Sequence, residues 1–408
     1  MGKALLVCAR NVTTTLGSGD EFNLFGYISD TTTEANAQVS CTEAATFSLA
    51  GSRVLSGNSG TATFAFRDAG AAGSQTYDIT GVAANEDATH TDVLSAGDLF
   101  NIAYTDTGTN STCAWHKMNV EFSSGHGSFL GAAAYAGVVY DAASATNFIM
   151  LHSNLLADGV STEDNVEFKA RGFDSFEALQ VRVTANARTN NSDFKNRINA
   201  GDGTGLVQFT TGATGLLSDT GIGDSISDGQ TVNASITLDT GVEDLTVTFV
   251  VATLKSSTSK SDIFAGSVGG LARAASATAH YFSIGGLFTS TTAVTEAQAR
   301  IKVGFAAVVS NLRCYLSANT YTVNGTLKLY QNGSPVITTT ITASGGAAWY
   351  ENTSDTITID ADDELSFEFD EGTTGDITIH SVGITFAPVA AGGTTYAGWS
   401  VNSKGSWW

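Results

Sequence analysis

Internal repetition is the feature of this sequence that most limits what it can fold into. The segment Ala142–Thr146 recurs unchanged at Ala274–Thr278, 132 residues later, and an aromatic-bearing strand pattern follows each copy. Two further pairs of segments match at offsets of 133 and 132, namely Leu179–Asn186 with Leu312–Asn319 and Leu245–Phe249 with Ile377–Ser381. Several matches at nearly one spacing indicate tandem copies of a single domain.

The first third of the chain carries a weaker trace of the same period. Its segment Trp115–Phe122 ends 132 residues before Leu254, the end of the corresponding strand in the second copy. Long Gly/Ala loops in this third leave open whether it keeps every strand. We predict three domains, residues 1–124, 125–257 and 258–388, followed by a tail, residues 389–408. About 130 residues are enough for a two-layer core without disulfides or metals.

The third copy shows most clearly what each domain is. Apolar and polar residues alternate from Leu312 to Val323, and a period of two indicates a strand with one buried face. Asn324-Gly325 and Asn332-Gly333 flank the next strand and predict tight hairpin turns. About eight such strands follow one another without a helical period. We therefore predict an all-β chain of three tandem antiparallel β-sandwich domains, jelly-roll-like in type.

The charge balance excludes several classes of partner. The chain has 19 Lys and Arg against 40 Asp and Glu, a formal net charge of −21. Such a chain repels phosphate backbones and anionic lipids, so we predict no nucleic-acid binding and no membrane insertion. The apolar run Ala4–Ala9 is too short for a signal peptide, so we expect it to form the first strand of a chain that stays uncleaved.

Motifs for catalysis or cofactor binding are missing from the sequence. The four cysteines show no C-x-x-C spacing and are expected to be reduced, and the six histidines form no H-E-x-x-H motif. His116 and His380 occupy corresponding places in the closing strands of two copies, which favours a role on a sheet face. We predict no catalytic residue, no cofactor and no enzymatic activity.

One acidic loop is a candidate for calcium binding, because hard cations prefer clustered carboxylate oxygens. The other two copies have only Asp98 and Asp228 near the corresponding place, so a solvated loop is the preferred interpretation. The candidate ligands are Asp360, Asp362, Asp363 and Glu364.

Two groups of residues are candidates for contact with a partner. Three of the five Trp residues, Trp399, Trp407 and Trp408, lie in the last ten residues, where exposed rings would be costly. They are expected to dock on this chain or on a neighbouring subunit, and both alternatives stay open. Arg182 and Arg188 lie in the one basic-rich stretch, which indicates either contact with an acidic partner or second copy, or ordinary sheet-surface charge.

The whole organisation resembles the surface proteins of tailed-bacteriophage virions, of the decoration, head-fibre or tail-appendage type. The features that carry this resemblance are tandem β-sandwiches, an acidic surface rich in Thr, Ser, Gly and Ala, and only two Pro and four Cys. The resemblance implies a non-enzymatic outer accessory protein, made in the host cytoplasm and located on the virion. It also implies a homo-oligomer, most commonly a trimer, attached to a capsid or tail protein.

Two alternatives from other functional classes remain at this point. The first is a carbohydrate-binding adhesin or receptor-binding tail protein, because jelly rolls often bind glycans through exposed aromatic residues; its partner would be a cell-surface glycan. The second is a polysaccharide-degrading enzyme. It is weakened because no pair of copies shares a catalytic constellation.

Overall fold

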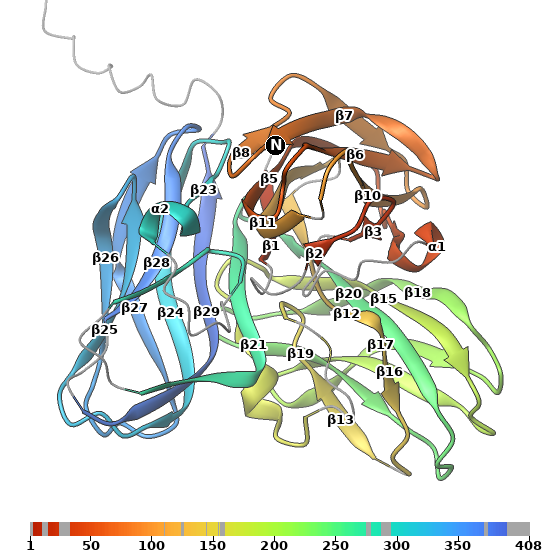
Figure 1. Cartoon of the computed structure of the whole chain (residues 1–408). Helices are drawn as coiled ribbons and strands as arrows, with labels where there is room; N and C mark the ends of the chain where they lie inside the picture. The colour runs from red at the N-terminus through yellow and green to blue at the C-terminus, as the bar shows by residue number, and fades with distance from the viewer. Residues whose placement is uncertain are drawn as a thin grey trace, which may run out of the picture.

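The computed structural model of the chain is built almost entirely from antiparallel β-strands, which form six sheets paired into three sandwiches (Figure 1). The residues that it describes are 3–9, 15–23, 33–109, 111–123, 126–143, 145–153, 155, 160–274, 279–286, 295–370 and 374–389. Within this part of the chain, no helix is long and apolar enough to cross a membrane.

Domain 2 shows the strand order most simply. One sheet has the order β12-β20-β15-β18 and the other β13-β19-β16-β17, with the short β14 also on β19. Counting β13 and β14 as one interrupted strand, the two orders are 1-8-3-6 and 2-7-4-5, the order of a jelly roll. The elements are β12 (His126–Tyr140), β13 (Thr146–Ile149), η1 (Glu163–Val166), β14 (Phe168–Lys169), β15 (Ser175–Asn186), β16 (Ser192–Ile198), β17 (Gly201–Phe209), β18 (Gly215–Ser225), β19 (Thr231–Thr237) and β20 (Leu245–Ser256).

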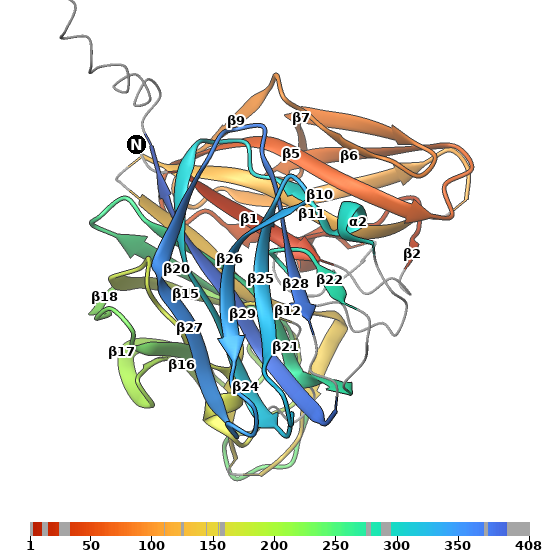
Figure 2. The same ribbon diagram turned by 90° about the vertical axis from the view of Figure 1, so that its left-hand side faces the viewer.

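Domain 3 has the same order, β21-β29-β24-β27 against β22-β28-β25-β26, with β23 on β28. Figure 2 looks onto this domain, whose two sheets lie one behind the other. Its elements are β21 (Ser261–Ala274), β22 (His280–Phe282), α2 (Glu296–Ala299), β23 (Ile301–Lys302), β24 (Ala307–Asn319), β25 (Gly325–Gln331), β26 (Ser334–Ile341), β27 (Ala348–Ile359), β28 (Glu364–Asp370) and β29 (Asp376–Pro388).

Domain 1 keeps the complete set of strands in spite of its divergent sequence. Its sheets are β1-β11-β5-β8 and β3-β10-β6-β7, with β9 on β5, β4 on β10 and β2 on β11. Its elements are β1 (Ala4–Ala9), β2 (Thr15–Leu16), β3 (Glu21–Phe22), α1 (Glu34–Ala37), β4 (Val39–Ser40), β5 (Ala45–Ser56), β6 (Thr61–Asp68), β7 (Ala71–Thr80), β8 (Ala84–Glu86), β9 (Thr91–Leu94), β10 (Leu99–Asp106) and β11 (Ser111–Phe122). The predicted domain boundaries fall between β11 and β12 and between β20 and β21.

One of the two predicted hairpins is wrong. Asn332 and Gly333 have φ angles of 51° and 83° and join β25 to β26, as the Asn-Gly signal predicts. Asn324-Gly325 instead leads from β24 in one sheet to β25 in the other, because β24 pairs with β27 and β29 and β25 pairs with β26 and β28. Strand alternation looks the same whether the chain turns back or crosses the sandwich.

A single helical turn precedes strand three in every domain, although the sequence shows no helical period. Each of these helices, α1, η1 and α2, is four residues long and begins with a glutamate. That glutamate forms an ion pair with an arginine of its own domain. In α1 and η1 the arginine lies on β6 or β16, so the ion pair holds the helix against the sheet. In α2 the arginine directly follows the helix, and the Ser366 hydroxyl on β28 donates a hydrogen bond of 2.7 Å to the glutamate instead. The three pairs are Glu34 with Arg67, Glu163 with Arg197 and Glu296 with Arg300.

The three domains close into a ring around a common centre (Figure 1). The first strands β1, β12 and β21 contact one another there, and the closing strands beside them are buried on both faces. Each domain also inserts side chains into the core of the preceding one. Trp115 of domain 1 joins the domain 3 core, Phe129 of domain 2 joins the domain 1 core, and Phe264 of domain 3 joins the domain 2 core.

Side chains from strand six of each domain bond the outer edge of strand five. In domain 2 the Asp224 and Asp219 carboxylates accept the backbone N–H groups of Thr204 and Leu206, at 2.7 and 2.8 Å. In domain 1, Asp92 on β9 and Asp87, which lies between β8 and β9, bond β7 in the same way. In domain 3 the Asn352 amide donates to a carbonyl of β26. Unpaired edge strands are templates for aggregation, so these contacts protect the edges.

Glycine in strand five is what lets a carboxylate reach the backbone there. A Cβ atom at Gly203 would collide with Asp224 and Asn196, whereas one at Gly201 in the same strand would lie 3.4 Å from its nearest neighbour, an ordinary contact. We expect Gly203→Ala to cost about 1–3 kcal/mol of unfolding free energy and to increase aggregation, because it displaces the Asp224 carboxylate. Chemical denaturation and light scattering measure both effects; Gly201→Ala is the control, and equal behaviour of the two variants would contradict this role of Gly203.

Candidate functional site at the domain junctions

The ring is closed by one kind of polar contact that is used three times. The short strand before strand three of each domain presents a backbone carbonyl, and a long side chain of the following domain donates a hydrogen bond to it. Domain 2 binds domain 1, domain 3 binds domain 2, and domain 1 binds domain 3, so the contact is head-to-tail and closes after three steps. The pairs are Gln180 Nε2 to Ser40 O (2.8 Å), Arg313 Nε to Lys169 O (2.8 Å) and Lys117 Nζ to Lys302 O (2.9 Å).

The junction of domains 2 and 3 has a fully buried ion pair at its centre. The side chains of Asp262 on β21 and Arg313 on β24 are both inaccessible to solvent, and their charged atoms lie 2.8 Å apart. The Asp262 carboxylate also accepts the backbone N–H groups of Arg171 and Gly172 in domain 2, at 2.9 and 2.7 Å, and the Thr385 hydroxyl at 2.5 Å. One carboxylate therefore joins the two domains and neutralises a buried guanidinium group.

A second acidic residue, Glu351 on β27, strengthens the same junction. It forms ion pairs with Lys169 and, at 2.6 Å, with Arg171, both from domain 2. Burial alone would raise the pKa of Glu351, but its hydrogen bonds to these two cations hold that pKa below its ordinary value. Lys169 also lies over the ring of Trp349, 5.3 Å from its centroid.

The other two junctions use weaker versions of the same chemistry. Between domains 1 and 3, the Lys117 ammonium group, which is almost fully buried, pairs with Glu86, and Lys302 lies 3.0 Å from the same carboxylate. Between domains 1 and 2, Lys255 pairs with Glu43 at 2.9 Å. All three junctions therefore combine an apolar centre with oppositely charged partners.

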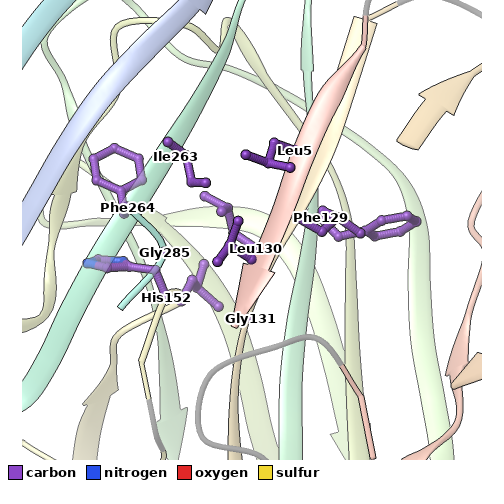
Figure 3. A pocket seen from close by; sticks show the side chains of 11 residues that line it. Leu5, Phe129, Leu130, Gly131, His152, Ile263, Phe264 and Gly285 are labelled. Atoms are coloured by element: carbon purple, nitrogen blue, oxygen red, sulfur yellow. The ribbon is translucent and has the colours of Figure 1, made fainter. Parts of the chain in front are cut away.

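At the centre of the ring the three first strands line a small hollow of about 30 Å³ (Figure 3). Leu5, Leu130 and Ile263 line it from the three domains, and Phe264 and His152 lie on one side. This space is the size of a single water molecule and is mostly apolar. It is therefore a packing defect on the ring axis, too small for an organic ligand.

His152 is buried where all three domains meet. Its Nε2 lies 3.1 Å from the Ser381 hydroxyl, and its ring packs on Phe264 at 5.1 Å between centroids. Burial, and secondly the charge of Arg313, lower the pKa of His152 from 6.5 to about 3. The imidazole is thus neutral in the folded ring.

This buried histidine predicts acid sensitivity. In the unfolded chain its pKa is 6.5 and in the ring about 3, so the unfolded state takes up the proton first as pH falls. The stability of the ring is therefore undiminished above pH 6.5 and decreases from there toward pH 3, by about 2 kcal/mol at pH 5 from this group alone. Denaturation curves at pH 7 and pH 5 measure the loss.

We expect His152→Gln to remove that part of the pH dependence, because glutamine can bond Ser381 but cannot be protonated. Ser381→Ala, which removes the hydrogen bond but keeps the titratable imidazole, serves as the control and should retain the pH dependence. An unchanged slope in His152→Gln would show that the acid sensitivity comes from other groups.

A larger polar hollow of about 520 Å³ opens at the rim of the junction between domains 2 and 3. Arg171, Asp174, Asp228, Lys260 and Asn311 contribute polar groups to it. Most of these groups already have partners within the chain: Arg171 pairs with Asp228 at 2.9 Å, and Asp174 accepts the backbone N–H of Ser257 at 2.7 Å. The hollow is therefore polar but offers few uncommitted charges.

The structure places the two candidate arginines very differently. Arg188 is fully buried within domain 2, where it pairs with Asp239 at 3.0 Å and donates to the carbonyls of Gly241 and Tyr140. It holds loops together and is absent from the surface. Arg182 is half-buried on β15, and this burial lowers its pKa.

The acidic loop of domain 3 is occupied by contacts within the protein. Asp363 accepts hydrogen bonds from the Asp360 backbone N–H and from Gln331, and Asp362 pairs with Lys302 at 2.8 Å. Glu364 lies 3.5 Å from Arg300. In the described part of the chain, no three His, Cys, Asp or Glu side chains gather as a metal site would require. The structure thus gives each calcium candidate a turn or ion-pair role.

The remaining candidates divide between the interior and the part outside the described residues. Trp399, Trp407 and Trp408 lie outside the described residues. His116 and His380 are buried at corresponding places in β11 and β29, hydrogen-bonded to Ser52 and Ser317 at 2.5 and 2.9 Å. Three cysteines are buried and form no disulfide among the described residues, namely Cys41, Cys113 and Cys314.

Serine–histidine pairs are the nearest approach to catalytic chemistry in the described residues, since a nucleophilic serine needs a histidine base that a third group orients. The pairs of His116, His152 and His380 are buried, out of reach of a substrate. His126 lies 2.5 Å from the Ser259 hydroxyl in the linker between domains 2 and 3, but its second ring nitrogen is buried without a hydrogen-bond partner. The orienting group of a triad is therefore missing from this pair.

Comparison with known proteins gives fold-level likeness alone. No protein-family model and no curated protein matches the chain. Among solved structures it is similar to one titled "The Triple Jelly Roll Fold and Turret Assembly in an Archaeal Virus", with 12% identity, coverage of 87% of this chain and 82% of that chain, and a TM-score of 0.18. It is similar to the major capsid protein P2 of bacteriophage PM2, with 8% identity, 65% and 98% coverage and a TM-score of 0.18.

A third similar structure is the insecticidal delta-endotoxin Cry8Ea1 of Bacillus thuringiensis, with 11% identity, 62% and 60% coverage and a TM-score of 0.20. All three TM-scores lie far below 0.5. The assignment of three jelly-roll-like sandwiches therefore rests on the strand order and pairing described above.

Proposed function

We propose that this chain is a non-enzymatic structural component of a bacteriophage virion, an outer accessory protein of the capsid-decoration or fibre type. The observation that carries the proposal is the closed ring of three jelly-roll-like domains within one chain. Viral capsid proteins are among the main users of this fold. Because one fold can host many functions, the role is assigned by analogy of architecture. The described residues contain no complete catalytic constellation that would favour an enzyme.

The physical properties of the ring support a passive role. Its junctions are closed by buried ion pairs and shared apolar cores, and side chains of the neighbouring strand bond the outer edges of strand five. Twelve described cations form ion pairs inside the chain, and the excess of carboxylates gives a net negative charge that keeps the protein in solution. A particle component needs this combination of rigidity and solubility.

The homo-oligomer implied by the sequence remains part of the proposal. It would have to use surfaces outside the ring contacts, because these contacts are already closed within one chain. Light scattering on the full chain and on a chain ending at Pro388 tests this part: we expect an oligomer for the full chain and a monomer for the shortened one. A monomer in both cases would remove the oligomer from the proposal.

Fractionation of virus particles tests the virion role. Antibodies raised against the purified protein should detect it in density-gradient fractions that hold intact particles, and immunogold labelling should mark the outside of those particles. Detection only in the soluble fraction of the lysate would overturn the proposal. Tight binding on a glycan array would favour an adhesin, and measurable cleavage of a polysaccharide would favour an enzyme.

A further inference from the structure

We propose that domains 1 and 2 together form a complete binding surface for domain 3, so that domain 3 stays bound in the ring as a separate chain. The partner that this surface fits is thus a jelly-roll domain supplied without a covalent link. The inference rests on the contacts around domain 3 and on the linker that leads into it.

Domain 2 contributes the polar half of this surface. The Asp262 carboxylate of domain 3 accepts two backbone N–H groups of domain 2, and Arg313 donates to the Lys169 carbonyl at 2.8 Å. Glu351 adds ion pairs to Lys169 and Arg171. None of these contacts involves the linker, so cutting it removes none of them.

Domain 1 contributes an apolar contact and a charged contact on another side of domain 3. Trp115 and Leu5 of domain 1 belong to the domain 3 core cluster, and both are nearly inaccessible. Lys117 donates to the Lys302 carbonyl at 2.9 Å, and Lys302 pairs with Glu86 at 3.0 Å. Domain 3 is therefore held from two directions, as the third member of a closed ring must be.

The linker itself adds little to the attachment. It comprises the four residues between the end of β20 and the start of β21, and Ser257 and Thr258 are exposed. Ser259 has a φ angle of 62°, which is unfavourable for a residue with a side chain. Apart from hydrogen bonds of Ser257 to Asp174 and of Ser259 to His126, its contacts are local. A cut at Thr258 therefore leaves the ring contacts in place.

A cleavable version of the full chain tests the proposal. A recognition sequence for a site-specific protease is inserted between Thr258 and Ser259, and the purified protein is cut in native buffer. We expect the fragments 1–258 and 259–408 to elute together at the position of the uncut chain and to separate only in denaturant. Separate elution or precipitation of the fragments directly after cutting would overturn the proposal.

Two matched variants show whether the ring contacts hold the fragments together. Lys117→Met removes a hydrogen bond from domain 1 to domain 3, across the two fragments, together with the ion pair to Glu86 within domain 1. Gln180→Met removes two hydrogen bonds to Ser40, which join domains 1 and 2 within one fragment. We expect Lys117→Met to raise the dissociation constant of the cut ring at least about tenfold and Gln180→Met to leave it within about twofold. Equal effects of the two variants, or none from Lys117→Met, would contradict the assigned surface.

Discussion

Asp262→Ala is expected to lower the free energy of unfolding by about 3–5 kcal/mol. The substitution leaves the Arg313 guanidinium buried without its counter-charge, and a buried charge that loses its partner is strongly destabilising. It also removes the acceptor of two backbone N–H groups of domain 2. Denaturant titration followed by tryptophan fluorescence and circular dichroism measures the loss.

Two further variants serve as controls for Asp262→Ala. One measures the loss of an exposed ion pair, and the other removes the buried ion pair completely so that no charge is left unpaired. Asp228→Ala removes an acidic residue that forms an ion pair with the Arg171 side chain. Because the Asp228 side chain is 72% exposed, we expect a loss of less than about 1 kcal/mol of unfolding free energy. The double variant Asp262→Leu with Arg313→Met should recover part of the loss, because apolar residues replace a buried ion pair without leaving a charge. Recovery should stay incomplete, since the two domain 2 N–H groups remain without an acceptor. A loss in Asp262→Ala no larger than that in Asp228→Ala would contradict the prediction.

Phe129→Ala is expected to cost about 3–5 kcal/mol and to destabilise two domains at once. Phe129 belongs to β12 of domain 2, but its ring packs against two rings of domain 1. The distances between ring centroids are 5.8 Å to Phe100 and 5.1 Å to Phe122. Truncation leaves a cavity inside a core that the two domains share. We therefore expect a single unfolding transition at lower denaturant concentration, measured by circular dichroism.

Phe129→Leu is the control, because it keeps most of the apolar volume and should cost about 1 kcal/mol. Two separate transitions in Phe129→Ala, with one domain melting before the rest, would show that the domains unfold independently. That outcome would contradict the shared core even if the total loss of stability were as large as expected.

The strands could largely be predicted from the sequence, because each one records its own burial pattern. Alternation from Leu312 onward and the Asn332-Gly333 turn predict β24, β25 and β26 as strands. Their pairing could not be predicted in the same way. Asn324-Gly325 carries the same turn signal as Asn332-Gly333, yet the chain there crosses to the opposite sheet. Local φ preferences describe a turn and do not specify which strands it joins.

One repeated motif escaped the sequence interpretation, although its signal is present in the sequence. The motif runs from the glutamate that begins each short helix to the residue whose carbonyl accepts a hydrogen bond from the next domain. Its three copies are Glu34–Ser40, Glu163–Lys169 and Glu296–Lys302. The offsets are 129 and 133 residues, close to the period of the other repeats. A four-residue helix shows no helical period, so only comparison of the three copies could have found it.

The residues that join the domains were the part of the site that sequence reasoning missed. The sequence offers Arg188 as a candidate for external contact, but the structure buries it within domain 2. No sequence pattern marks Asp262, Arg313 and Glu351 as junction residues. A charged side chain looks the same in sequence on a surface or in a junction. The long apolar segment of β20, Leu245–Leu254, does indicate burial on both faces, but it does not show what covers the second face.

Period, composition and offsets are enough to predict an all-β chain with three copies of one domain and an acidic surface. These signals are local or statistical and need no partner. The closed ring, the buried Asp262–Arg313 pair and the neutral state of His152 become visible only in the folded arrangement. The three hydrogen bonds that close the ring join residues 140, 144 and 185 positions apart in the sequence. The energy of each depends on burial and on its partner residue, and both are in place only when the whole chain has folded.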